Sequence, residues 1–357
     1  MNARSESSSF ASLLNAPLRV IALRNSDDVS IASSASGGAF VVLAHAMLNR
    51  GGVVFGAALL ESGRVEHVCA KNISELRALQ GSKYVRSDVA DTYGECYDYL
   101  SRGVDVLYSG TPCQIAALRS YLKKRNVANL PGSLVCVDLI CHGTPGQEIF
   151  KAYISWLSAI ERTDDGIHGY EFRNKLMGWG LYYYYYYYRS GKRHEKLGQA
   201  SDDPYYSAFA KGIIYRKCCY SCPFARIERT GDFTVGDFWG IEDCHTDFYD
   251  ERGVSAVLIN SIEANDFFND YCIDKCEWID STVENVIARN GNLSGPTKRT
   301  EEQEELATEV EKAVADGDYD KAFGELLKPR LSVTAKIRCL LPWKVVRIMY
   351  KVRRLVV

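Results

Sequence analysis

The stretch VDVLYSGTPCQIAALRSYLKKR (residues 104–125) decides the fold. Its first seven residues suit a buried strand, and the residues from Pro112 onward have the pattern of an amphipathic helix. Thr111 stands directly before Pro112, which is the favoured order for a helix N-cap and a first helical residue. The stretch therefore predicts a strand that leads directly into a helix, with Cys113 in the first helical turn.

The same pattern occurs again immediately downstream. SLVCVDLICHG (133–143) predicts a strand that ends at Cys141, and PGQEIFKAYISWLSAIE (145–161) predicts a helix that begins near Pro145. Upstream, residues 39–49 form an apolar helical run and residues 53–60 a strand. Strands that alternate with helices predict βαβ units and a largely parallel sheet.

The second half of the chain has a different pattern. Residues 168–174, 181–190 and 192–198 suggest strands, the last two joined by a tight turn at Ser190 and Gly191, which predicts an antiparallel insert. The seven consecutive tyrosines (182–188) alternate faces in such a strand, so we expect a structural role for them. Residues 301–328 form an acidic helix or helix pair.

These patterns predict an α/β protein with a mostly parallel sheet of βαβ units, an antiparallel insert and a helical C-terminal extension. We expect four segments: a lead (1–19), an N-terminal α/β half (20–162), a C-terminal half that carries a CxxC motif (163–290), and a helical extension with a basic amphipathic tail (291–357).

The composition is that of an ordinary globular protein, with 46% hydrophobic and 25% charged residues and a net charge of −2. The overall composition and net charge therefore give no indication of a nucleic-acid partner. No apolar run approaches the roughly 20 residues of a membrane span, and the N-terminus makes a poor signal peptide. We expect a cytoplasmic protein. Its basic tail (335–357) either contacts the inner face of the membrane or forms a helix that packs against the body of the protein or against a partner subunit.

Twelve cysteines are many for a cytoplasmic chain, which favours metal or redox chemistry over a disulfide framework. Cys96 and Cys136 lie in apolar patterns typical of a core. Cys113 and Cys141 follow successive strands, and the carboxyl edge of a parallel sheet is where ligands bind. The sequence therefore predicts that these two thiols emerge side by side at that edge.

RKCCYSCPFAR (216–226) supplies a second pair, Cys219 and Cys222, at CxxC spacing. No second CxxC follows at the spacing of a zinc ribbon, and Cys272 and Cys276 lie in an expected helix. Joined with Cys113 and Cys141, the pair would form a four-cysteine site. Spacing alone is equally compatible with tetrahedral zinc and with a [4Fe–4S] cluster.

A second candidate site lies at SSASGGAF (33–40), just before the predicted helix 39–49. Backbone amides at a helix N-terminus can hold a phosphate, although an ordinary Ser/Gly cap has the same sequence. Lys83, Arg173 and Lys175 are either contacts to an anionic ligand or solvated charges. VGDFWGI (235–241) places Trp239 between glycines, which suits either a flat ring or core packing.

The motifs SSASGGAF, GSKYVRSD, SGTPCQIAAL, DLICHGTPG, FRNKLMGW, DDPYYSAF, CYSCPFA and GDFWGIE occur in this order. Together they resemble the beta-subunit family of coenzyme F-420 hydrogenase and dehydrogenase, which is also similar to hydroxymethyl-chlorophyll reductase. The resemblance extends from about residue 20 to about residue 259.

The resemblance implies a flavoprotein in which FAD exchanges hydride with a deazaflavin-type or related substrate and single electrons with a [4Fe–4S] cluster. It implies the cluster ligands Cys113, Cys141, Cys219 and Cys222, and leaves Cys218 out. It also implies the FAD contacts Ser36, Gly37, Gly38, Lys83, Tyr84 and Thr111, while no residue is assigned a catalytic role.

One departure from the family concerns the route of electrons. Many relatives carry a ferredoxin-like segment with repeated CxxC motifs ahead of this region, whereas the first cysteine here is Cys69. We therefore expect the partner to be a separate electron-transfer protein, such as a ferredoxin or another subunit. The alternative is a non-catalytic scaffold or partner-binding module at the membrane surface, with zinc or no metal at the cysteines.

Overall fold

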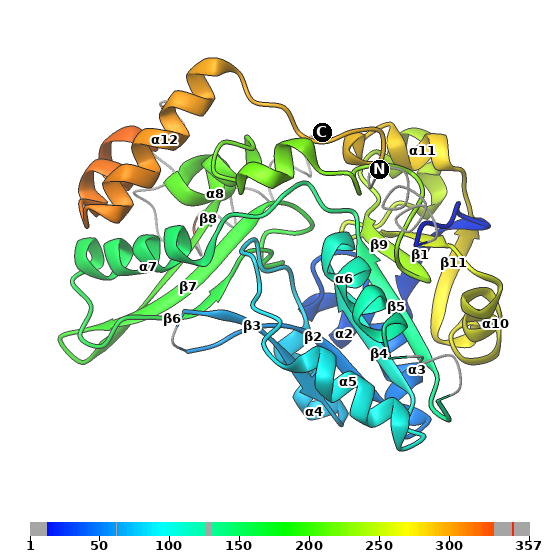
Figure 1. Ribbon diagram of the computed structural model, residues 1–357. Coiled ribbons are helices and arrows are strands. Elements are labelled where there is room, and N and C mark those ends of the chain that lie inside the picture. The colour runs from blue at the N-terminus through cyan, green and yellow to red at the C-terminus, as the bar shows by residue number, and fades with distance from the viewer. Residues whose placement is uncertain (1–12, 62, 126–129, 332–344, 346–357) are drawn as a thin grey trace, which may run out of the picture.

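The computed structural model describes residues 13–61, 63–125, 130–331 and 345, and contains two sheets (Figure 1). The larger sheet has eight strands in the order β11-β1-β10-β9-β5-β4-β2-β3, and the smaller has three in the order β6-β7-β8. The strands are β1 (Arg19–Asn25), β2 (Val53–Leu59), β3 (Val65–Ala70), β4 (Val106–Gly110), β5 (Leu134–Leu139), β6 (Ile167–Glu171), β7 (Tyr182–Arg189), β8 (Lys192–Gln199), β9 (Phe233–Asp237), β10 (Ser255–Ile259) and β11 (Cys276–Asp280).

The helices lie between these strands and at the end of the described chain. They are α2 (Asp28–Ser33), α3 (Ala39–Asn49), α4 (Ile73–Leu76), α5 (Thr92–Ser101), α6 (Pro112–Lys123), α7 (Gln147–Glu161), α8 (Pro204–Ala210), α9 (Ile241–Cys244), α10 (Ile262–Tyr271), α11 (Val283–Ile287) and α12 (Glu301–Ala315). A π-helical turn, Asp320–Leu326, follows α12. Among the short 3-10 turns, η4 (Lys217–Ser221) holds the first cysteine of the CxxC motif.

Parallel strands form the centre of the larger sheet. β2, β4, β5 and β9 pair in parallel, whereas β3, β10, β1 and β11 pair antiparallel to their neighbours. Because β1 is antiparallel to β10, which is antiparallel to β9, β1 runs with the central strands. Five of the eight strands thus share one direction, which confirms the predicted mostly parallel α/β sheet.

Helices cover both faces of this sheet. On β1, Ile21 and Leu23 pack in the core beneath α3 and α10. Val20 and Ala22 of the same strand point to the opposite face, where they pack with residues of α9 and α11. This alternation is the period-2 pattern of a strand buried on both sides. Farther along, α5 and α6 cover β2, β4 and β5 on the same side as α9 and α11.

The antiparallel insert is confirmed as a separate sheet beside a second core. Ser190 and Gly191 both have positive φ (52° and 70°), as a two-residue hairpin turn requires. Of the tyrosines on β7, Tyr185 and Tyr187 are buried and donate hydrogen bonds to Glu161 at the end of α7. Figure 1 shows α7, α8 and α12 gathered around this sheet.

Three local predictions were wrong. β5 ends at Leu139 rather than Cys141, and α7 begins at Gln147 rather than near Pro145, so Cys141 lies in a loop. Cys276 begins β11 instead of continuing a helix. Its strand conformation is set by pairing with β1, 250 residues upstream in sequence.

The predicted basic tail, residues 335–357, falls outside the described residues except Val345. Among the residues that are described, no helix is both long and apolar enough to cross a bilayer.

Candidate metal centre and cofactor site

The four predicted cysteines meet at the carboxyl edge of the central strands. Cys113 is the second residue of α6, Cys141 follows β5 by two residues, Cys219 lies in η4 and Cys222 caps that turn. Burial, together with the charges of the other three thiols, raises the pKa of Cys141 to about 12. The four cysteines come from three separate parts of the chain, and the other three thiols all contribute to the raised pKa of Cys141.

Backbone amides in the surrounding loops favour thiolates at three of these positions. Burial raises the pKa of Cys141, Cys219 and Cys222. The backbone N–H of Gly143 lowers the pKa of Cys141, and the backbone N–H of Thr144 lowers that of Cys219, but both effects are smaller than that of burial. The backbone N–H groups of Phe224 and Ala225 do the same for Cys222. Amide hydrogen bonds to sulfur are a feature of iron–sulfur sites, so the donor set suits an anionic cluster.

The fourth thiol has a different environment. Cys113 is exposed, and the Thr111 hydroxyl oxygen lies 3.2 Å from its sulfur. The backbone N–H of Thr111 donates to the Gln114 side-chain oxygen at 2.9 Å, which fixes the start of α6. Thr111 thus lies beside Cys113, and its expected contact with FAD stays a prediction.

The thiols do not form a finished ligand shell. Across the described residues there is no group of three or more His, Cys, Asp or Glu side chains arranged to hold a metal ion. Cys218, also exposed, raises the pKa of Cys219 and Cys222 and so lies beside them. The cysteines are brought together, and binding would require them to close further around the metal.

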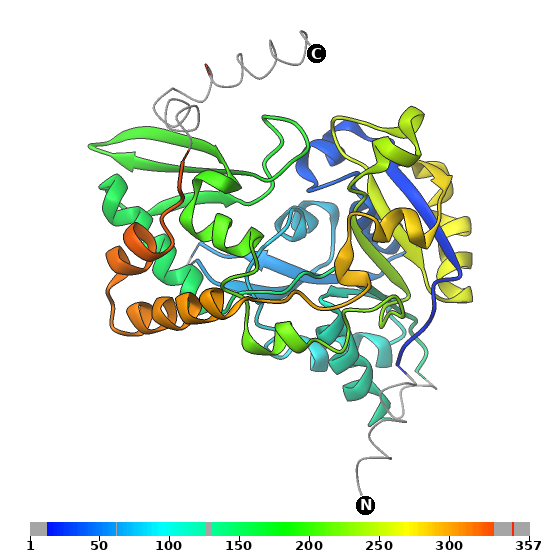
Figure 2. The same cartoon turned by 90° about the horizontal axis from the view of Figure 1, so that it is seen from above.

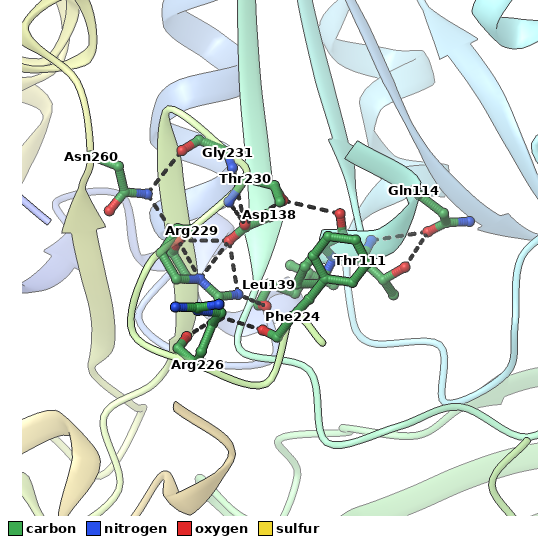
Figure 3. Close-up of polar contacts among 12 residues, drawn as sticks. Thr111, Gln114, Asp138, Leu139, Phe224, Arg226, Arg229, Thr230, Gly231 and Asn260 are labelled. Atoms are coloured by element: carbon green, nitrogen blue, oxygen red, sulfur yellow. Dashed lines mark hydrogen bonds and ion pairs between the residues drawn. The ribbon is translucent and has the colours of Figure 1, made fainter. Parts of the chain in front are cut away.

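Figure 3 shows a buried ion pair between Asp138 and Arg229, with the hydrogen bonds around it. Asp138 on β5 is fully buried, and one of its carboxylate oxygens accepts from Arg229 at 3.1 Å and from the Thr234 hydroxyl at 2.6 Å. The other oxygen accepts from the backbone N–H groups of Thr230 and Gly231, both at 3.0 Å. Burying a charge is costly unless its hydrogen bonds are satisfied, and here they are.

This network reaches the main chain beside every cysteine segment. Arg229 donates to the Phe224 carbonyl at 3.3 Å, two residues after Cys222. It also donates to the Leu139 carbonyl at 2.9 Å, two residues before Cys141. The Thr230 hydroxyl donates to the Pro112 carbonyl at 3.0 Å, next to Cys113. Sequence analysis missed this network. Its one signal is an aspartate inside the apolar run VCVDLI (135–140), which requires a buried partner.

The loop before α3 is buried between strands. Gly37 approaches the backbone of Leu23 and Ser255 so closely that a Cβ would lie 2.3 Å from the Leu23 oxygen, and Gly38 has a φ of +86°. The Ser36 hydroxyl donates to the Val254 carbonyl at 2.7 Å. Both glycines are buried, and their N–H groups make no hydrogen bond to the described residues.

Lys83 and Tyr84 lie in the loop that faces this edge of the sheet. The Lys83 ammonium donates to the Ala78 and Gln80 carbonyls at 2.9 and 2.7 Å, and loss of hydration lowers its pKa to about 7. The Tyr84 ring stacks on Phe209 with the centroids 4.2 Å apart. A bound anion would favour the charged form of Lys83.

Arg173 is occupied by protein groups. It forms a bidentate pair with Asp237, both contacts at 2.7 Å, and also donates to the Tyr84 hydroxyl, the Ala35 carbonyl and the Gly180 carbonyl. These contacts use all five of its N–H groups. Burial raises the pKa of Asp237, but the guanidinium outweighs this and holds it below its ordinary value. Arg173 therefore fixes the loop before α3 rather than offering a free charge.

Lys175 and the tryptophans complete this region. The Lys175 ammonium donates to the Ile31 and Ser36 carbonyls at 2.7 and 2.5 Å. Trp179 stacks on Trp239, with centroids 4.7 Å apart, and donates to Asp237 at 2.7 Å. Trp239 thus packs against another ring of the protein, one of the two roles expected for it.

The comparison with family profiles matches residues 104–284 to the C-terminal region of the coenzyme F420 hydrogenase/dehydrogenase beta subunit. This region is half of the 357-residue chain. The chain belongs to this family. The matched region contains all four cysteines of the candidate centre and the whole Asp138–Arg229 network, whereas Ser36, Lys83 and Tyr84 precede it.

Comparison with solved structures finds similarity to a chain of the xenon-derivatized F420-reducing [NiFe] hydrogenase complex from Methanosarcina barkeri. The two chains are 16% identical, with a TM-score of 0.49, and the match covers 84% of this chain and 93% of the other. A search of curated proteins returns no match.

Proposed function

We propose that this member of the family is a flavin- and iron–sulfur-dependent oxidoreductase. It would exchange hydride with a deazaflavin-type or related substrate, and single electrons with a partner redox protein. The observation that carries the proposal is the convergence of Cys113, Cys141, Cys219 and Cys222 on one edge of the sheet. Burial raises the pKa of Cys141, Cys219 and Cys222, and backbone amides of the surrounding loops act in the opposite direction on each of them.

When bound, FAD would convert a hydride into two single electrons and a proton, or the reverse, and a [4Fe–4S] cluster would carry these electrons one at a time. The residues of the chain supply binding and orientation. The four thiolates would hold the cluster, and the amides of Gly37 and Gly38 with Lys83 would hold the phosphates. Thr111 borders Cys113, so a flavin that contacts it would lie next to the cluster.

The neighbouring cysteines supply a sharp test of this proposal. The protein is purified without oxygen, reconstituted with iron, sulfide and FAD, and analysed for bound iron and flavin. We expect both cofactors in the unaltered chain. Cys219→Ala should lose most of the iron, whereas Cys218→Ala, the adjacent exposed cysteine, should keep it.

Two results would contradict the proposal. Equal iron content in both variants would remove Cys219 from the ligand set. A colourless, flavin-free protein after reconstitution would instead favour the scaffold alternative, with zinc or no metal at the cysteines.

A further inference from the structure

The surface beside the candidate cluster has a strong local charge. Residues 204–227 contain four Lys or Arg residues and no Asp or Glu. Lys211, Arg216 and Lys217 are exposed, and within the described chain none of them forms an ion pair. The fourth, Arg226, is neutralised by Glu228 at 2.7 Å. We call Lys211, Arg216 and Lys217 the cationic face.

The cationic face adjoins the thiols directly. The backbone N–H of Cys219 donates to the Arg216 carbonyl at 2.8 Å, so Arg216 lies one turn before the first cysteine of the CxxC motif. Lys217 precedes Cys218, which is exposed. Lys211 precedes Gly212, whose carbonyl accepts from the Tyr220 hydroxyl at 2.7 Å. The three cations therefore surround the turn that carries the CxxC motif.

A distant segment borders the cationic face. The Thr297 hydroxyl donates to the His142 carbonyl at 2.9 Å, and Arg299 lies 4.0 Å from the centre of the Tyr220 ring. Figure 2 shows this segment, in orange, passing beside the green chain that follows α8. It brings the exposed Lys298 to the edge of the face, beyond which Glu301 and Glu302 begin α12.

We propose that the cationic face is the docking surface for an acidic electron-transfer protein; this inference rests on the proposed function. The chain as a whole has a net charge of −2, whereas this face carries three cations that form no ion pair within the described chain, so it would attract an acidic partner. Docking at this turn places the partner next to the exposed Cys218 and close to Cys113, the exposed member of the ligand set. An electron then passes between the cluster and the partner's redox centre, one being oxidised as the other is reduced.

The test uses an acidic ferredoxin as the probe and measures its association rate with the full chain at several ionic strengths. We expect the triple variant Lys211→Gln, Arg216→Gln, Lys217→Gln to associate at least tenfold more slowly at low salt and to depend less on salt. A control that removes the same number of charges changes three exposed cations of the smaller sheet's hairpin, through Arg189→Gln, Lys192→Gln and Arg193→Gln, of which Arg193 pairs with Glu195. We expect this control to change the rate less than twofold.

Equal losses in the two triple variants would overturn the proposal, because net charge alone would then explain the effect. No association with ferredoxin, or preferential association with phosphatidylserine vesicles or duplex DNA, would also overturn it. Binding is measured with and without the cluster. If the protein binds no iron but still associates with ferredoxin, only the proposed function is contradicted. If the protein holds the cluster but does not associate with ferredoxin, only this inference is contradicted.

Discussion

Asp138 and Arg229 show how one buried pair can organise a site that it does not touch. Their side chains are 0% and 2% exposed, so each depends on the other to remain charged inside the protein. Through Arg229 and Thr230 the pair fixes carbonyls on all three cysteine-bearing segments. Removing either charge would leave the other unpaired, at a cost of about 3–5 kcal/mol, and would risk unfolding the protein.

Thr230 offers a milder test of this network. Thr230→Val removes the hydroxyl that joins Asp138 to the Pro112 carbonyl, so we expect unfolding free energy to fall by about 1–2 kcal/mol. Iron retained after reconstitution should fall as well, because the segment of Cys113 loses one of its links to the segment that follows the CxxC motif. Thr230→Ser keeps the hydroxyl and should restore iron binding. Urea unfolding and iron analysis measure the two effects, and normal iron in the valine variant would contradict the positioning role.

Sequence predicted the cysteine set but not the residues behind it. The CxxC motif and the thiols after two strands are local patterns, visible within a few residues. Asp138 and Arg229 are 91 residues apart in sequence, and the residues next to each of them do not indicate that the two side chains pair. Arg173 illustrates the same limit, because its pairing with Asp237 depends on the tertiary fold.

At the scale of elements, the loop between β5 and α7 sets the place of Cys141. Gly143 has a φ of +128°, and a Cβ there would lie 2.3 Å from the Tyr215 ring. Gly143→Ala should therefore destabilise the protein by about 1–3 kcal/mol and reduce iron binding. Gly146, in the same loop, has a φ of −69° and open space around its Cα. Gly146→Ala should change stability by less than about 0.5 kcal/mol; equal effects in urea unfolding would argue against this account.

Helix α8 leads into the cysteine segment and begins at a buried carboxylate. Asp203 caps the helix by accepting from the Tyr206 N–H at 2.7 Å and also bonds the Tyr153 hydroxyl. Burial raises its pKa to about 6, so the folded protein binds this proton more tightly than the unfolded chain does. The resulting stabilisation is complete below about pH 4 and is lost as pH rises through about 6.

Asp203→Asn tests this pH dependence and keeps a capping side chain. From pH 7 to pH 5, the unaltered protein should gain about 1 kcal/mol of unfolding free energy relative to the variant. Comparing the two proteins cancels the titration of other groups. Parallel pH profiles in urea unfolding would show that Asp203 is not perturbed.

Local pattern also explains which elements could be predicted. α3, the β4–α6 unit and the hairpin of β7 and β8 have sequence signals of their own, and the structure confirms them. β1, β3 and β11 were not predicted. β1 and β11 pair with each other, and β1 also pairs with β10, so their conformation is set by residues more than 200 positions away.

At the scale of the whole molecule, Arg173 joins the two sheets. It follows β6 of the smaller sheet and pairs with Asp237 at the end of β9 in the larger one. Its side chain is only 1% exposed, so Arg173→Met should destabilise the protein by about 3–5 kcal/mol. Arg193→Met removes a cation from the exposed Arg193–Glu195 pair and should cost less than about 1 kcal/mol. Similar costs in urea unfolding would contradict the joining role.

The central claim is that the four cysteines hold a [4Fe–4S] cluster, and electron paramagnetic resonance tests it most directly. The chain is reconstituted anaerobically with iron and sulfide and reduced with dithionite. The account predicts the signal of a reduced [4Fe–4S] cluster in the unaltered protein and in Cys218→Ser, and its loss in Cys222→Ser. A silent spectrum with stoichiometric zinc, or a signal that persists unchanged in Cys222→Ser, would contradict it.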